Sequence, residues 1–189
     1  MKYDSLTASG YYHIFNKGNN GEGIFIEEMN YFYFLNLIKK YLIPVAEIWS
    51  YCLLKNHFHL LVRIKDELED KDISKAFSNL FNAYSKSINK KYNRNGSLFT
   101  DRFKRIKVED EKYLIAIILY IHLNPVHHGF VSNLDKYQHS SYNAIISDKP
   151  TLIERYEVLE MLGGLDNFIH VIKNKKLQID EQLESMIFE

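Results

Sequence analysis

The amino-acid sequence predicts an α+β fold, and three observations predict it. Apolar residues recur at helical spacing in three segments of the first 125 residues and alternate at strand spacing in four others. These segments follow one another in the order β-α-β-β-α-β-α. A chain of 189 residues with 46% hydrophobic content is long enough to bury a core and to add a modest extension. We therefore expect a ferredoxin-like sandwich, an antiparallel sheet with helices on one face, plus a helical C-terminal extension.

The first half of the chain predicts a strand, a helix and a hairpin. Residues 11–15 form the first strand, and a Gly-Asn-Asn-Gly turn follows at 18–21. A helix extends from Tyr31 to Leu42, because its apolar residues keep helical spacing until Pro44 interrupts them. Residues 45–54 and 57–64 then form two strands, and the tight connection at Lys55-Asn56 joins them into a hairpin.

The second half predicts a helix, a strand and a second helix before the extension. After an acidic linker at 65–72, residues 73–88 form an amphipathic helix that ends at 93–96. A strand at 103–108 precedes a helix that Asp110 caps and Pro125 ends at about Asn124. Helices at 151–162 and 165–175, separated by Gly163-Gly164, make up the extension. The expected division is a core domain over 1–147 and a helical accessory extension over 148–189.

The formal net charge is zero, but the charges are unevenly distributed. Residues 84–107 hold eight Lys and Arg against one Asp, and residues 148–189 hold nine acidic against five basic residues. Aromatic residues are interleaved with the basic ones, as in surfaces that bind single-stranded nucleic acid, although a solvated helix face over core aromatics gives a similar pattern. The candidate DNA-binding residues are Lys86, Lys90, Arg94, Arg102, Lys104 and Arg105.

Two further features concern the location of the protein. No stretch is apolar enough to span a membrane, and the start of the chain does not resemble a signal peptide. The single cysteine, Cys52, has no partner for a disulfide. We expect a cytoplasmic protein that does not associate with membranes.

His57 and His59 are two residues apart on the predicted strand 57–64, so their side chains lie on one face of it. Phe58 and Leu60 then point to the opposite face and into the core. Two imidazoles on one face can share a metal ion. The same spacing also fits two hydrogen-bonded histidines on a half-exposed strand.

Tyr120 and Asn124 are four residues apart near the end of a predicted helix and therefore lie on one helix face. A phenol, with a pKa of about 10, is a poor nucleophile until a metal ion or a base assists it. A histidine pair that binds a metal would give that assistance. The other interpretations are a packing tyrosine, one of 14 in the chain, and an asparagine that caps the helix end.

Five motifs between residues 10 and 145 together resemble the single-tyrosine HUH transposases, in particular the REP-associated tyrosine transposases. They are Tyr-His-Ile-Phe-Asn-Lys at 12–17, Asn-His-Phe-His within 54–62, the basic loop at 96–103, Tyr-Ile-His-Leu-Asn-Pro-Val at 120–126 followed by Gly129, and His-Ser-Ser-Tyr at 139–142. The family typically has Met-Pro before the Asn-His pair, where this chain has Leu54-Lys55. That departure concerns the turn and leaves the histidines in place.

The resemblance implies a mechanism. His57 and His59 would bind a divalent cation, with Asn124 as a candidate third ligand, and Tyr120 would attack a phosphate of single-stranded or hairpin DNA. The products would be a 5′-phosphotyrosine and a free 3′-hydroxyl, and residues 1–147 would be the catalytic domain. Mixed imidazole and amide ligands suit Mn²⁺, and Mg²⁺ is the abundant alternative. Homodimerisation stays open.

Two other classes of function are open at this point. A non-catalytic RNA-binding module shares the ferredoxin-like fold, but its aromatic, glycine-containing strand signature is missing here. A zinc hydrolase or deaminase would use the same histidine pair, yet the paired cysteines and the His-x-Glu of such sites are absent. Of the remaining histidines, we expect His13 to be structural, and His127 and His128 to lie at the surface or to contact DNA.

Overall fold

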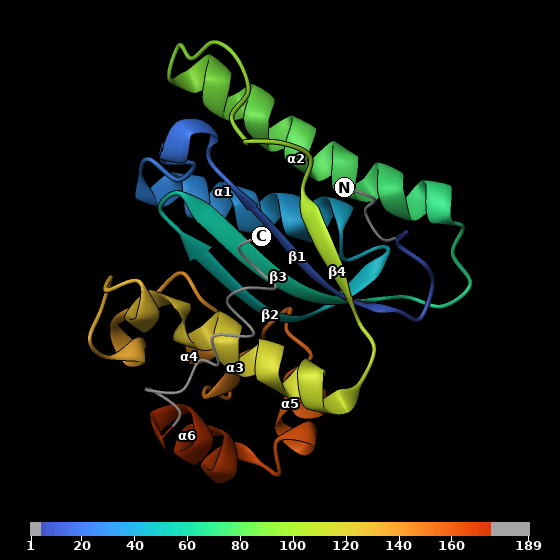
Figure 1. The fold of residues 1–189 in the computed structure, drawn as a ribbon, viewed down its shortest axis with the longest axis vertical. Helices are drawn as coiled ribbons and strands as arrows, with labels where there is room; N and C mark the ends of the chain where they lie inside the picture. Colours follow the sequence, from blue (N-terminus) through green and yellow to red (C-terminus); the bar gives the residue numbers. More distant parts are fainter. Residues whose placement is uncertain (1–4, 175–189) are drawn as a thin grey trace.

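The computed structural model describes residues 5–174, which form a four-stranded antiparallel sheet with helices on both faces (Figure 1). The strand order is β2-β3-β1-β4, so β1 and β3 are central, and the α+β class and the antiparallel sheet are confirmed. The strands are β1 (Tyr11–Lys17), β2 (Ala46–Leu54), β3 (His57–Ile64) and β4 (Lys104–Val108). The helices are α1 (Glu28–Tyr41), α2 (Asp70–Lys91), α3 (Glu111–His127), α4 (Tyr142–Ile145), α5 (Arg155–Met161) and α6 (Leu165–Asn174), with 3-10 turns at Asn19–Gly21 and Leu134–Lys136.

The hairpin of β2 and β3 has the boundaries that its sequence predicts, except that β2 begins at Ala46, one residue later than expected. β2 ends at Leu54, β3 begins at His57, and these two residues face each other across the two-residue turn. The turn is held from outside, since the backbone N–H groups of Ile24 and Phe25 both donate to the carbonyl of Lys55. This docking fixes the position of the first residues of β3, where the histidine pair lies.

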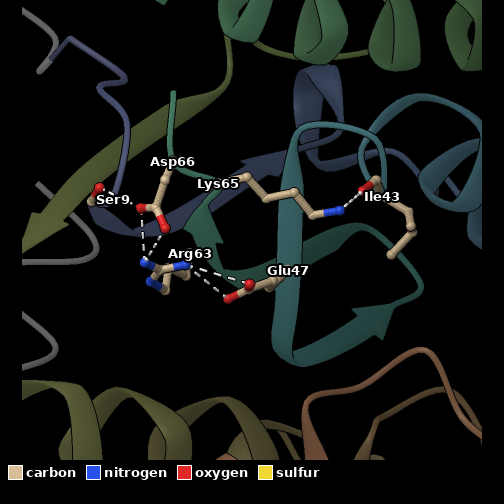
Figure 2. A network of polar contacts seen from close by, with 6 residues as sticks. All are labelled: Ser9, Ile43, Glu47, Arg63, Lys65 and Asp66. Atoms are coloured by element: carbon tan, nitrogen blue, oxygen red, sulfur yellow. Dashed lines mark hydrogen bonds and ion pairs between the residues drawn. The ribbon is translucent and has the colours of Figure 1, made fainter. Parts of the chain in front are cut away.

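The opposite end of the hairpin is held by a polar network (Figure 2). Arg63 on β3 donates to Glu47 on β2 at 3.3 Å and to Asp66 at 2.9 Å, and Ser9 also donates to Asp66. Lys65 donates to the carbonyl of Ile43 at 2.7 Å. Such half-exposed ion pairs contribute little stability individually, but together they oppose a slip of the strand register. A slip of one residue would turn both histidines to the other face of the sheet.

One face of the sheet is covered by α1 and α2 (Figure 1). Phe58 on β3 packs between Phe34 on α1 and Phe81 on α2, with ring centroids 5.2 and 5.4 Å apart. The second helix begins at Asp70, earlier than the sequence pattern indicated. Its first turn takes up the last acidic residues of the predicted linker, where negative charge is favourable at a helix N-terminus.

The prediction of helices on one face only is wrong, because α3 lies on the opposite face and contacts β2, β3 and β4 (Figure 1). Every residue from Ile117 to Pro125 is buried, so this helix has no side for solvent and must be covered all round. The middle of the strand face that carries the histidines is accordingly buried as well, and Leu61 on that face is fully inaccessible to solvent.

The boundaries predicted for two of the later helices also differ from the observed ones. Asp110 caps α3 as expected, by accepting from the backbone N–H of Tyr113, but Pro125 does not end the helix, which extends to His127. A proline in the last turn removes one hydrogen bond and leaves the following backbone free to continue. The helix predicted from residue 151 begins at Arg155, because Ile153 forms a bridge with Ile48 of the edge strand. The last residue predicted for the final helix, 175, lies outside the described residues.

The described part of the extension, 148–174, covers the outer side of α3. Phe168 on α6 is fully buried and packs edge-on against His122 of α3, with ring centroids 5.6 Å apart. The glycines between α5 and α6 adopt positive φ values of 73° and 97°, as the predicted helix stop requires. The domain boundary at residue 147 stays a prediction. Within residues 5–174, no helix is long and apolar enough to cross a membrane.

Candidate metal and nucleophile site

The two histidines at the start of β3 are oriented by hydrogen bonds from their Nδ1 atoms. His57 Nδ1 lies 2.8 Å from the side-chain oxygen of Asn56, and His59 Nδ1 lies 3.0 Å from Nε2 of His13 on β1. The two rings are perpendicular, with centroids 5.3 Å apart. Because both Nδ1 atoms are engaged, the Nε2 atoms are the ones left to interact with anything else.

Helix α3 brings Tyr120 and Asn124 to the same face of the sheet. The Tyr120 ring meets the His59 ring edge-on, with centroids 5.5 Å apart, and the His13 ring at 6.2 Å. The Asn124 amide nitrogen donates to the carbonyl of Tyr120 at 2.9 Å, one turn back along the helix. This bond leaves the side-chain oxygen of Asn124 as its remaining polar atom.

Three buried polar atoms at this point fit the ligand set of a divalent cation. Nε2 of His57, Nε2 of His59 and Oδ1 of Asn124 each lack a hydrogen-bond partner among the described residues. Buried polar atoms are nearly always paired, so such a group calls for an explanation. Within 5–174, no group of three His, Cys, Asp or Glu residues is placed to hold a metal ion, so the site offers two imidazoles and one amide. The remaining coordination positions would be open to water and phosphate oxygens.

The site favours neutral imidazoles. The pKa of His57 is lowered to about 4, mainly by burial and also by the nearby His128 and Lys17, and a side-chain contact with Asn124 opposes this shift. Burial, followed by the neighbouring histidines, lowers the pKa of His59 well below its ordinary value. Neutral imidazole is the form that binds metal ions, so the lone pairs are available at neutral pH.

The buried histidines predict that the metal-free fold is sensitive to acid. Burial lowers the pKa of His13 to about 3 and that of His122 to about 4, whereas an unfolded histidine titrates at about 6.5. Between these values the unfolded chain binds more protons than the folded chain, so the free energy of unfolding decreases as the pH falls from 6.5 towards 4. Each of the two histidines lowers the free energy of unfolding by up to about 1.4 kcal/mol for each pH unit in this range. Thermal melting in EDTA from pH 7 to pH 5 measures the slope.

A matched pair of variants tests whether His122 contributes to this dependence of stability on pH. His122→Gln removes one buried imidazole and should make the melting temperature less dependent on pH. His170→Gln changes an exposed histidine on α6 and should leave the dependence as it is. Equal slopes for the wild type and His122→Gln would show that His122 does not titrate as its burial requires.

The His-Ser-Ser-Tyr motif at 139–142 fixes the orientation of α3 about its own axis. Ser141 Oγ lies 2.8 Å from Nε2 of His122 on α3 and accepts from the backbone N–H of Tyr51 on β2 at 2.9 Å. His122 Nδ1 bonds to the carbonyl of Ile118 at 2.8 Å. This buried link joins the helix that carries Tyr120 to the edge of the sheet, which gives the motif a structural role.

Two lysines lie on the strand face that carries the histidines. Lys17 is the register partner of His57 across β1 and β3, and Lys104 is the partner of Phe15 across β1 and β4. The Lys104 ammonium lies 5.8 Å from the centroid of the Phe15 ring. Lys104 is among the basic residues predicted from the sequence, whereas Lys17 is not. Its signal was the strand alternation itself, which places residue 17 on the same face as residues 13 and 15.

The other predicted basic residues lie elsewhere. Arg102 and Arg105 line a cleft of about 610 Å³ between α2 and the segment that leads into β4, together with Asn16 and Phe103. The Arg105 guanidinium is 5.2 Å from the centroid of the Phe103 ring.

The three remaining residues of the predicted set lie outside this cleft. Arg94 forms an ion pair with Glu22, and Lys86 and Lys90 are exposed on α2. The structure therefore divides the six residues between the two sides of the sheet, and their role in binding DNA stays a prediction.

The four residues predicted for the reaction meet at one place: His57 and His59 from β3, Tyr120 and Asn124 from α3. His13, expected to be structural, lies in contact with His59. His128, at the end of α3, is exposed, and its ring centroid is 4.9 Å from that of His57. The sheet therefore presents a histidine pair to a helix that carries a tyrosine and an asparagine on the facing side.

Comparison with known proteins gives the family. The model of the IS200-like transposases matches residues 7–124, and the chain belongs to this family of DNA-cleaving enzymes. No curated protein matches it. A solved structure of a REP-associated tyrosine transposase bound to a REP hairpin is similar with a TM-score of 0.65 and 17% identity, covering 79% of this chain and 87% of that chain. A putative transposase from Deinococcus radiodurans R1 gives a TM-score of 0.42 and 16% identity, covering 64% of this chain and 95% of that chain.

Proposed function

We propose that the protein binds single-stranded or hairpin DNA and cleaves and rejoins it through a 5′-phosphotyrosine on Tyr120, with a divalent metal ion. The observation that carries the proposal is the position of the Tyr120 ring, edge-on to His59 at 5.5 Å, beside three buried polar atoms without a partner among the described residues. A packing tyrosine needs no such neighbours. The family supplies the class of reaction, DNA cleavage, and the geometry supports these residues for it.

Nε2 of His57, Nε2 of His59 and Oδ1 of Asn124 would hold the cation, which we take to be Mg²⁺ or Mn²⁺. Bound there, it would stabilise negative charge on the oxygens of the scissile phosphate. The protein's own contribution is the orientation of the two imidazoles by Asn56 and His13, which occupy the Nδ1 atoms and leave the Nε2 atoms for the cation.

Tyr120 would act as the nucleophile. Its phenolic oxygen attacks the phosphorus, the bond from phosphorus to the 3′-oxygen breaks, and the phenolic proton is balanced by the proton that the 3′-oxygen gains. The phosphodiester is thus replaced by a phosphotyrosine without net hydrolysis. Attack by a 3′-hydroxyl on the same phosphorus reverses the step and rejoins the strand. Lys17 and Lys104, on the same strand face, would neutralise flanking phosphates.

The nucleophile is covered in the structure described, because Tyr120 is only 2% exposed. A phosphate can reach the phenol only if neighbouring side chains are displaced when DNA binds. Active-site geometry commonly tightens or rearranges in the complex with substrate, so this burial is compatible with the proposed role.

The DNA partner is proposed from charge and from the similar structure. The REP-associated transposase was solved with a REP hairpin, and the basic segment of this chain has the composition of a surface that binds a DNA strand. In the proposal, the cleft with Arg102 and Arg105 receives part of the DNA. The cytoplasmic location and homodimerisation stay predictions.

The arginines of this cleft give a prediction. Arg102→Ala combined with Arg105→Ala should weaken binding of a DNA hairpin with single-stranded flanks and reduce its salt dependence. Removing one contact to a phosphate lowers the slope of log K against log salt by about 0.7 to 0.9. Fluorescence anisotropy at several salt concentrations measures both quantities. Lys71→Ala, at the other end of α2 and paired with Glu69, is the control that should leave them unchanged. Unaltered affinity and slope in the double variant would place the DNA elsewhere.

The proposed function itself is tested by trapping the covalent intermediate. The protein is incubated with end-labelled hairpin DNA carrying single-stranded flanks and Mn²⁺, then denatured and separated by electrophoresis. We expect a labelled species that resists denaturation, and a modified peptide containing Tyr120 in the mass spectrum. Cleavage without any adduct would instead favour a metal-activated water and the hydrolase class.

A further inference from the structure

We propose that His13 is a positioning residue for the metal site. Its Nε2 accepts a hydrogen bond from the Nδ1–H of His59, and His59 thereby keeps the lone pair of its Nε2 for the cation. This inference rests on the proposed function, because it assigns a role towards the same cation. His13 is not a ligand in this proposal. It acts through His59, from the neighbouring strand, 46 residues away in the sequence.

The geometry of the pair is that of a supporting contact around a metal ligand. His13 Nε2 lies 3.0 Å from His59 Nδ1, and the two rings are inclined by only 21° with centroids 5.1 Å apart. Phe15 stacks on His13 at 4.8 Å and fixes its plane. Both histidines are almost completely buried, so water does not compete for this hydrogen bond.

The hydrogen bond can be made in two ways, and only one of them suits a metal ion. A neutral imidazole has one N–H donor and one nitrogen with a free lone pair. If His13 donated, His59 would carry its proton on Nε2, and that nitrogen could not bind a cation. If His59 donates from Nδ1, its Nε2 keeps the lone pair. Metal-binding histidines usually donate their other N–H to an acceptor in this way.

His57 shows the same arrangement with a different acceptor. Its Nδ1 faces Oδ1 of Asn56, which can only accept, so His57 carries its proton on Nδ1 and has a lone pair on Nε2. The two candidate ligands therefore each have an acceptor behind them, an amide oxygen for His57 and an imidazole nitrogen for His59. This parallel is the argument that His13 belongs to the site.

A purely structural role does not explain a histidine at this position. His13 is completely buried, and its Nδ1 has no hydrogen-bond partner among the described residues. A buried polar atom without a partner destabilises the fold, and a phenylalanine would fill a similar volume without that penalty. Within the described part of the chain, the side chain of His13 is hydrogen-bonded to His59. The orientation and protonation of the His59 ring therefore give the reason for a histidine at position 13.

Mn²⁺ affinity is the first readout. His13→Phe keeps a ring in the core but removes the acceptor, and His13→Gln restores an acceptor oxygen close to the position of Nε2. By isothermal titration calorimetry on the full chain without DNA, His13→Phe should bind Mn²⁺ about 10- to 100-fold more weakly, and His13→Gln should recover most of that loss. Ile14→Val, the neighbour that faces the other side of β1, controls for a loosened strand. Melting in EDTA confirms that each variant folds.

The tautomer of His59 is the second readout, and it needs neither metal nor activity. Long-range ¹H–¹⁵N correlation spectra of the metal-free protein should show His59 protonated on Nδ1 in the wild type and in His13→Gln. In His13→Phe the Nε2-protonated form should appear. A wild-type His59 protonated on Nε2 would overturn the inference.

His57→Ala separates failure of this inference from failure of the proposed function. If His57→Ala loses Mn²⁺ binding while His13→Phe keeps it, the metal site stands and the role of His13 is wrong. If His57→Ala binds Mn²⁺ as tightly as the wild type, the metal site itself is wrong, and the inference about His13 is overturned with it.

Discussion

Tyr120→Phe should abolish strand cleavage and the covalent protein–DNA adduct while DNA binding and thermal stability change little. The substitution removes one oxygen and keeps the ring that packs edge-on against His59 and His13. Loss of the nucleophile removes the covalent route entirely, so cleavage should fall by at least about 10⁴-fold, whereas the free energy of unfolding should change by no more than about 1 kcal/mol. Cleavage of labelled hairpin DNA, anisotropy and melting curves measure the three quantities.

Tyr113→Phe is the matched control for this result. Tyr113 lies two turns before Tyr120 on α3 and is half-buried. Its variant should cleave DNA at the wild-type rate. An adduct that persists in Tyr120→Phe and maps to Tyr113 or to another tyrosine would show that the class of reaction is right and the assigned nucleophile is wrong.

His57→Ala should abolish Mn²⁺-dependent cleavage and leave a folded protein. His57 is only partly buried at the first position of β3, so its truncation removes little packing. It does remove one of the two imidazoles of the proposed ligand set, which contains no carboxylate, and an amide with one histidine is a weak site for a divalent cation. Cleavage should therefore fall by about 100-fold or more at fixed Mn²⁺ concentration.

The control for His57→Ala is His170→Ala, which removes an exposed imidazole on α6. It should leave both Mn²⁺ binding and cleavage intact. Raising the Mn²⁺ concentration should partly rescue His57→Ala if the residue acts by binding the ion. Undiminished cleavage by a well-folded His57→Ala protein would exclude His57 as a ligand.

The sequence by itself determined the parts of the site that lie within one element. The boundaries of β3 follow from alternation, which also places His57 and His59 on one face. Helical spacing places Tyr120 and Asn124 on one face of α3, and the two-residue turn at Lys55-Asn56 fixes the start of β3. These features depend on backbone periodicity over a few residues, so local sequence contains the information for them.

Only the tertiary structure decided which of these elements meet. The strand order β2-β3-β1-β4 brings His13 beside His59 and Lys17 opposite His57. It also divides the basic segment, with Lys104 on the histidine face and Arg105 on the other. The apolar pattern of α3 showed that the helix is buried but not on which face of the sheet. Such pairings depend on crossovers and on register between segments distant in the chain, and periodicity within each segment contains no information about its partner.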